Sequence, residues 1–137
     1  MKVLVPTDGS EQAMKAVQRG LELAEKEGAE VTVMAVAYYA KTDFDEMPAN
    51  IQDKLEAEAA GALKKAKALF NANGVKVNAV LEAGVVPANN ILKRAEEGKF
   101  DRIIMGSTGL TGLKRTLMGS TAAKVVANAP CEVTVVR

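Results

Sequence analysis

The sequence predicts an α/β protein built on an open parallel sheet with helices on both faces. Short apolar runs alternate with longer stretches of helical periodicity, which is the pattern of strand–helix–strand units. The apolar runs are almost uninterrupted, as expected of parallel strands that are covered on both sides. The chain has 137 residues, 48% of them apolar, so we expect one domain, residues 1–137, with a packed core.

The first part of the chain contains two strand–helix pairs. The run "KVLVP" (2–6) is a short strand ended by turn residues, and Ser10 can cap the helix that follows. Small and apolar residues recur at helical spacing until Gly28, which we expect to end this helix in the left-handed conformation. A second strand, "VTVMAVA" (31–37), precedes a helix that has Pro48 in its first turn and stops at "NANG".

The rest of the chain continues the alternation. Its predicted elements are, in order, a strand "VKVNAVL" (75–81), a helix from about Pro87 to Gly98, a strand "RIIM" (102–105), a helix from Gly119 to about Asn128 and a strand "EVTVV" (132–136). Ligands of such sheets bind beyond the carboxyl ends of the strands, where the winding reverses. Two segments at such ends have suggestive chemistry, 6–10 and the glycine-rich loop after the fourth strand.

This loop reads "GSTGLTGLKRTLMGS" (106–120) and has the properties of an anion site. Its glycines let backbone amides approach a phosphate, and the helix that opens at its end adds unpaired N–H groups. Lys114 and Arg115 could add charge or extend into solvent. The Walker A and G-x-G-x-x-G motifs are both absent. The alternative is a glycine-rich connection that binds nothing.

Composition excludes several function classes. A net charge of +1, with two tyrosines, three phenylalanines and no tryptophan, offers no basic stacking surface for nucleic acid. No segment approaches the roughly 18 apolar residues of a membrane span. The lone Cys131 excludes an internal disulfide, and we interpret it as a core thiol in a cytoplasmic protein. The acidic residues Asp43, Asp45 and Glu46 are interpreted as hydrated carboxylates rather than a metal site.

The spacing Gly106-x-x-Gly109, nine residues, Gly119-Ser120 resembles a known signature. It is similar to G-x-x-G-(x)9-G-[ST] in the nucleotide-binding branch of the universal stress protein family. The resemblance covers nearly the whole chain, including "VLVPTDGSEQA", "AGVVPANNIL" and "APCEVTVV". It implies a Rossmann-like (adenine nucleotide alpha-hydrolase-like) five-stranded parallel sheet of order 3-2-1-4-5.

The resemblance also implies a ligand and its contacts. ATP, with Mg²⁺ or Mn²⁺, would lie across the ends of the first and fourth strands. The implied contacts are Pro6, Thr7 and Asp8 beside the adenosine, Val36 and Met105 against the adenine, and Gly106, Gly109, Gly119, Ser120 and Thr121 at the ribose and phosphates. Asp8, which precedes Gly-Ser, is also a usual turn residue. Many relatives carry histidine where this chain has Thr108, so no role of an imidazole carries over.

In the implied strand order, the last strand lies at an edge of the sheet. The run 132–136 is apolar and has no proline or inward charge to protect a solitary edge. We therefore expect it to pair with a second copy of the chain, and the resemblance likewise implies a homodimer joined through this strand.

These observations favour a regulatory, stress-response protein that binds ATP and hydrolyses it slowly or not at all. Only Asp8 is a candidate acid–base or metal-orienting group near the loop, whereas phosphoryl transfer needs several positioned groups. No catalytic residue is assigned. Two alternatives stay open: a slow ATPase on the same site, and a module that binds an unknown protein partner and retains only a vestigial nucleotide site.

Overall fold

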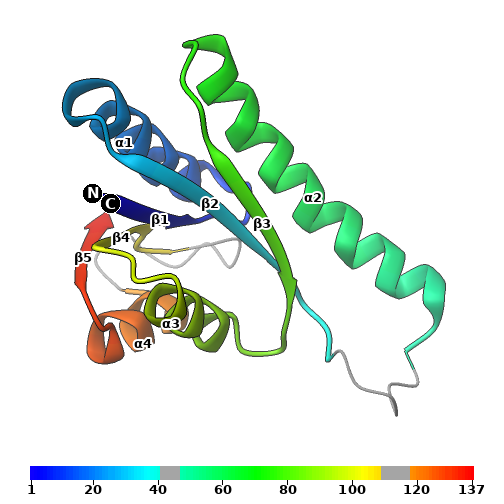
Figure 1. Ribbon diagram of the computed structural model, residues 1–137. Coiled ribbons are helices and arrows are strands. Elements are labelled where there is room, and N and C mark those ends of the chain that lie inside the picture. Colours follow the sequence, from blue (N-terminus) through cyan, green and yellow to red (C-terminus); the bar gives the residue numbers. More distant parts are fainter. Residues whose placement is uncertain (41–46, 109–117) are drawn as a thin grey trace.

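The computed structural model describes residues 1–40, 47–108 and 118–137. A five-stranded sheet of order β3-β2-β1-β4-β5 forms its centre, and every neighbouring pair of strands runs parallel (Figure 1). The predicted fold class and the implied strand order are therefore confirmed. No helix in the described ranges is both long and apolar enough to cross a membrane.

Strands and helices alternate along the chain as predicted. Their bounds are β1 (Lys2–Pro6), α1 (Glu11–Glu27), β2 (Glu30–Ala37), α2 (Ala49–Ala72), β3 (Asn78–Ala83), α3 (Pro87–Glu97), β4 (Arg102–Gly106), α4 (Ser120–Asn128) and β5 (Glu132–Val136). Ser10 caps α1 by accepting a hydrogen bond from the N–H of Ala13 at 3.2 Å, and Gly28 ends α1 with φ 68°. Pro48 is the N-cap of α2 rather than a residue of its first turn.

The third strand differs from the prediction. It was expected at 75–81 and lies at Asn78–Ala83. Val75 lies after α2 but is still bonded to its last turn, because its N–H donates to the carbonyl oxygen of Phe70 at 3.0 Å. The strand extends further than predicted because β2 continues to Ala37, which pairs with Ala83. Pairing with a neighbour, rather than the local apolar run, sets both ends.

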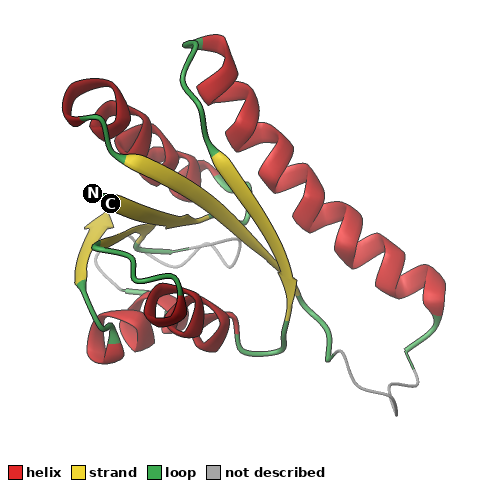
Figure 2. Ribbon diagram, in the orientation of Figure 1, coloured by secondary structure: helices red, strands yellow, loops and turns green. Residues whose placement is uncertain are grey.

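Helices α1 and α2 cover one face of the sheet, and α3 and α4 cover the other (Figure 2). Side chains of successive strand residues point to opposite faces, so each strand serves two cores. In β2, Val33 belongs to the same core as Phe70 on the α1–α2 side, whereas Met34 belongs to the same core as Ile91 on the α3–α4 side. This accounts for the nearly continuous apolar runs in the sequence.

Gly61 and Gly28 both have space for a side chain but differ in backbone conformation. A Cβ added at Gly61, inside α2, would meet no atom within 4 Å, and the same is true at Gly28, where φ is +68°. Because alanine favours helix over glycine, Gly61→Ala should raise the free energy of unfolding by about 0.5–1 kcal/mol. Gly28→Ala should lower it by about 1 kcal/mol, because a side chain disfavours the left-handed conformation. Urea denaturation measures both; shifts of the same sign would show that backbone conformation does not distinguish the two positions.

Candidate functional site

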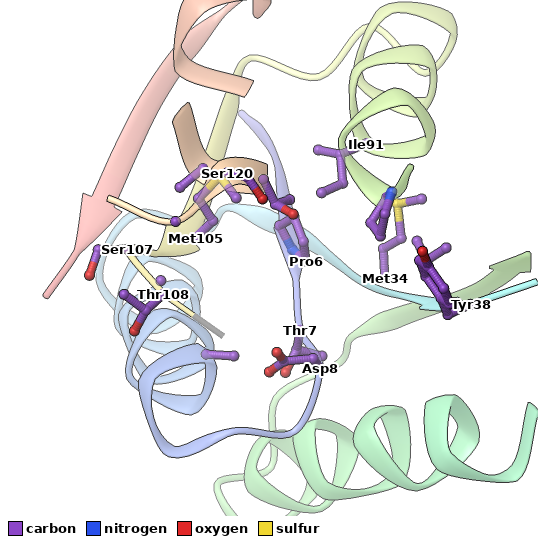
Figure 3. A pocket seen from close by; sticks show the side chains of 17 residues that line it. Pro6, Thr7, Asp8, Met34, Tyr38, Ile91, Met105, Ser107, Thr108 and Ser120 are labelled. Carbon is purple, nitrogen blue, oxygen red and sulfur yellow. The ribbon is translucent and has the colours of Figure 1, made fainter. Parts of the chain in front are cut away.

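A pocket of about 370 Å³ opens at the carboxyl ends of the central strands (Figure 3). Its walls come from the β1–α1 turn, β2, α3, the end of β4 and the first turn of α4. The strand order places β1 beside β4, while the connections from these two strands lead to helices on opposite faces. The pocket therefore lies where the winding of the sheet reverses, the usual ligand position in open α/β sheets.

The structure brings together all of the predicted site residues that it describes. The pocket is lined by Pro6, Thr7, Asp8, Val36, Met105, Gly106, Gly119, Ser120 and Thr121. Gly109 lies outside the described residues, as do Lys114 and Arg115. Residues from the two ends of the sequence thus meet in one cavity.

The β1–α1 turn is held by its own side chains. Thr7 is buried; its N–H donates to the carbonyl oxygen of Met34 at 2.8 Å, and its Oγ1 accepts from the N–H of Gly9 at 3.1 Å. Asp8 Oδ1 accepts from the N–H of Ser10 at 2.9 Å. Asp8 therefore has the turn role that its sequence context suggested, and it lines the pocket as well.

Gly106 ends β4 against helix α1. A Cβ at this position would lie 3.0 Å from the carbonyl oxygen of Gln12 and 3.1 Å from its carbonyl carbon. Because those atoms belong to a helix backbone, they cannot easily move away. The requirement for glycine at 106 therefore arises from the packing of β4 on α1, besides any contact with a ligand.

Ser107 closes the glycine-rich loop. Its N–H donates to the carbonyl oxygen of Val136 at 2.9 Å, and its own carbonyl oxygen accepts from the N–H of Gly119 at 2.7 Å. The Nε2 of Gln12 donates to the same Val136 oxygen at 2.8 Å and to Ser107 Oγ at 3.3 Å. Ser107 thus connects the end of β4 to the N-cap of α4, and β5 and α1 fix its position.

Helix α4 begins at the pocket with an open N-terminus. Gly119 is its N-cap, and no side chain makes a capping hydrogen bond there. The Gly119 carbonyl oxygen accepts from the N–H of Ala123, which is the first hydrogen bond of the helix. The N–H groups of residues 120–122 therefore have no acceptor within the helix. Ser120 and Thr121 add hydroxyl groups beside these donors. The helix dipole adds partial positive charge, so this corner of the pocket suits an anion.

The opposite end of the pocket is apolar and lies between β2 and α3. Its walls include Met34, Tyr38, Pro87 and Ile91, and Figure 3 shows Met34, Tyr38 and Ile91 away from Ser107 and Thr108. Val36 lies between Met34 and Tyr38 in the sequence and is half-buried.

The backbone of Val36 faces the pocket. Backbone groups of successive strand residues point to alternate edges, and the Met34 carbonyl points to β1, where it accepts from Thr7. The Ala37 carbonyl points the other way and accepts from Gly84 beside β3. The N–H and C=O of Val36 therefore point to the β1 side, beyond Pro6, the last β1 residue that pairs with β2.

Sequence reasoning missed several contributors to this site, among them Gln12, Met34, Tyr38, Pro87 and Ile91. Gln12 is an ordinary helix residue by pattern, and Pro87 and Ile91 were assigned only to a helix. Tyr38 carried one signal, because it directly follows the carboxyl end of an apolar strand, where open α/β sheets bind their ligands. Their shared role depends on the packing of α1 and α3 against the sheet, which local periodicity does not specify.

The pocket wall contains few ionisable side chains among its described residues. Asp8 is the one charged side chain among the described residues of the pocket wall. No group of three or more histidine, cysteine, aspartate or glutamate side chains is placed to hold a metal within the described ranges. The carboxylates at 43–46 lie outside those ranges. The arrangement can bind an elongated ligand with an apolar end and an anionic end.

Cys131 is not the core residue that the sequence predicted. It lies just before β5 and is only half-buried, at the margin of the α3–α4 core. Burial, with the negative charges of Asp101 and Glu132, raises the pKa of its thiol above the ordinary value. A raised pKa means less thiolate at neutral pH, so this cysteine is not an activated nucleophile.

Comparison with known proteins identifies relatives along the whole chain. Residues 1–137 match the model of the universal stress protein family. Universal stress protein MJ0531 of Methanocaldococcus jannaschii is 40% identical over 99% of this chain and 81% of its own length. Universal stress protein YxiE of Bacillus subtilis is 30% identical over 99% of this chain and 98% of its own length.

Solved structures show the same fold. Universal stress protein UspA from Lactobacillus plantarum superimposes with a TM-score of 0.87 at 27% identity, covering 100% of this chain and 97% of that chain. A universal stress protein in complex with cAMP has a TM-score of 0.77 at 24% identity, with coverages of 100% and 97%. The universal stress protein from Archaeoglobus fulgidus in complex with dAMP has a TM-score of 0.75 at 21% identity, covering 100% of this chain and 98% of that chain. The last two likenesses concern the fold alone.

Gly106 provides a test of the contact between β4 and α1. Gly106→Ala should lower the free energy of unfolding by about 1–3 kcal/mol, since the new methyl group collides with the Gln12 backbone. Urea denaturation measures this loss. Gly61→Ala, which adds the same methyl group where there is space, should change stability in the opposite direction. A Gly106→Ala protein as stable as the parent would show that α1 and β4 are less closely packed.

Proposed function

The chain belongs to the universal stress protein family, and from this premise we propose that it binds ATP in the pocket at the ends of β1, β2 and β4. The observation that carries the proposal is the division of this pocket. One end presents the open N-terminus of α4, and the other presents a backbone donor and acceptor among apolar side chains. Phosphates fit the first end and an adenine base the second.

The base end has the hydrogen-bonding pattern of adenine. An N–H and a C=O of one strand residue, Val36, can donate to N1 of adenine and accept from its exocyclic amino group. Guanine presents an acceptor and a donor in the reverse order on that edge, so it would oppose both groups. Apolar side chains of Met34 and Ile91 flank the position and favour a flat base over water.

The phosphate end uses backbone rather than charge. The free N–H groups that follow Gly119, with the hydroxyls of Ser120 and Thr121, would bind phosphate oxygens. Gly106 and Ser107 form the adjoining wall, since the Ser107 carbonyl accepts from the N–H of Gly119, and α1 and β5 fix their position. Pro6, Thr7 and Asp8 would lie beside the ribose and base, and Met105 behind the base. Gly109 joins this set from the signature alone.

Mg²⁺ or Mn²⁺ would accompany the phosphates. Such ions take oxygen ligands from phosphates, water and one or two carboxylates. Asp8 is the carboxylate among the described residues of the pocket wall, so its chemistry fits this need. When bound, the ion would neutralise phosphate charge.

We further propose that the bound nucleotide acts as a signal and is hydrolysed slowly or not at all. The described pocket wall lacks histidine, lysine and arginine, and one carboxylate cannot both orient a nucleophile and stabilise transferred charge. A location in the cytoplasm, where ATP is abundant, suits this role. The solved complexes with cAMP and dAMP support adenine nucleotides as a ligand class for this fold. A slow ATPase or a partner-binding module with an empty site are the alternatives.

Gly119 gives the sharpest test of the phosphate end. Gly119→Asp supplies a good N-cap for α4, so the fold should be at least as stable, yet its carboxylate would repel the phosphates. We expect ATP to bind about 100-fold more weakly, a loss of about 3 kcal/mol of binding free energy. Gly119→Asn has nearly the same shape and caps the same N–H groups without the charge, so it should lose some affinity but bind ATP clearly more tightly than Gly119→Asp.

The measurement is calorimetric titration of nucleotide-free protein with ATP and Mg²⁺, with phosphate release followed in parallel. If Gly119→Asp bound as tightly as Gly119→Asn, the phosphates would lie elsewhere. If the parent ignored ATP, the partner-binding alternative would replace the proposal. Phosphate release faster than about 1 s⁻¹ would favour an enzyme.

We also propose that two copies pair through β5. This strand is at the edge of the sheet. The Val136 carbonyl points to β4, where it accepts from Ser107, so the backbone groups of Val135 point to the open edge. That edge is apolar, lacks proline and could continue the sheet into a second molecule.

Val135→Pro tests this pairing. It removes an N–H that faces outward and leaves the bonds to β4 in place, so we expect a folded monomer in light scattering. Val135→Thr keeps the N–H and the β-branch and should stay dimeric. A dimeric Val135→Pro protein would place the subunit interface on another surface.

A further inference from the structure

Tyr38 stands out among the aromatic residues of this chain. It follows the last residue of β2 and is 62% exposed, whereas its neighbour Tyr39 is 5% exposed. Tyr39 belongs to the α1–α2 core, where its hydroxyl donates to the carboxylate of Glu56. Two consecutive tyrosines therefore have opposite surroundings, and only Tyr38 lines the pocket.

The position of Tyr38 follows from the period of the strand. Met34 and Val36 face the α3–α4 side of the sheet, and Tyr38, two residues further on, continues this row past the strand end. Figure 3 shows the ring beside Met34 at the end of the pocket away from Ser107 and Thr108. The ring thus forms the outer rim of the apolar end, and most of its surface is open.

We propose that Tyr38 binds the nucleotide by stacking its ring on the face of the base. This inference rests on the proposed nucleotide site and adds a contact that the site signature does not include. Val36 offers hydrogen bonds to the edge of a base, which leaves the two faces of the base to be covered. Inner apolar side chains such as Met105 can cover one face, and Tyr38 is the flat group available on the open side.

Stacking on an aromatic ring tolerates any base, because every base has a π-face. Tyr38 therefore adds affinity for the base as such, while the Val36 backbone selects adenine. This division predicts that loss of the ring lowers the affinity for every adenine nucleotide by the same factor, whatever its number of phosphates. It also predicts no change for a ligand that has phosphates and no base.

Substitution of Tyr38 tests the proposal against a structural role. Tyr38→Ala should lower the affinities for ATP and for AMP by a similar factor, roughly 5- to 100-fold. It should leave the affinity for inorganic tripolyphosphate unchanged. Tyr38→Phe keeps the ring and should bind ATP within a few-fold of the parent. Since the side chain is 62% exposed, neither change should lower the unfolding temperature appreciably.

Tyrosine fluorescence supplies an independent measurement. The chain has two tyrosines and no tryptophan, so a stacked base should quench the emission of Tyr38. Tyr38→Phe should abolish the quenching while ATP still binds, and Tyr39→Phe should preserve it. These signals require no loss of affinity and therefore do not depend on the alanine variant.

The outcomes separate this inference from the proposed function. If the parent binds ATP while Tyr38→Ala binds it equally well and quenching persists in Tyr38→Phe, the stacking contact is wrong and the nucleotide site stands. If Tyr38→Ala lowers the affinity for tripolyphosphate as much as that for ATP, Tyr38 maintains the shape of the site rather than contacting the base, and the proposal is overturned. If the parent binds no adenine nucleotide, both proposals fall together.

Discussion

The backbone of Ser107 holds together the elements that form the anion-binding end of the pocket. Its N–H is bonded to the end of β5 and its carbonyl to the start of α4, while Gln12 of α1 reaches both Ser107 and Val136. Because the residue is buried, these bonds are shielded from water and hold one geometry. The mouth of the glycine-rich loop and the N-terminus of α4 are thereby fixed before any ligand arrives.

If the proposed function holds, this arrangement makes the pocket a preorganised binding site. A phosphate would meet N–H groups that are already aligned, so little conformational entropy would be lost on binding. At the other end, β2 continues beyond Pro6, the last β1 residue that pairs with it, so the N–H and C=O of Val36 face the cavity. Both ends rely on backbone groups, whose positions are set by the sheet rather than by flexible side chains. The described pocket wall therefore has backbone groups that could bind a ligand, but few of the charged side chains that phosphoryl transfer would need.

The same contacts connect the pocket to the edge of the sheet. Val136 accepts from both Ser107 and Gln12, and it is the last residue of β5. The backbone groups of the residue before it point outward. The loop that would hold phosphates and the strand that would meet a second copy thus share one hydrogen-bonded junction. A nucleotide and a partner molecule would act on adjacent parts of the same short segment.

The sequence by itself determined the order of elements, the parallel sheet and the two segments that converge on the pocket. Periodicity and caps such as Ser10 and Gly28 are local features, and the residues that form them are neighbours in the chain. Family resemblance added the strand order and the list of contacts. Those contacts that the structure describes do meet in one cavity, although their binding roles stay predictions.

Only the tertiary structure decided the rest. The ends of β3 depend on its pairing with β2, and the need for glycine at 106 depends on the carbonyl of Gln12, far away in the sequence. The exposure of Tyr38, the partial exposure of Cys131 and the direction of the Val36 backbone likewise depend on where neighbouring elements begin and stop. Such features arise from contacts between distant segments, and no local pattern of residue types records which segments will meet.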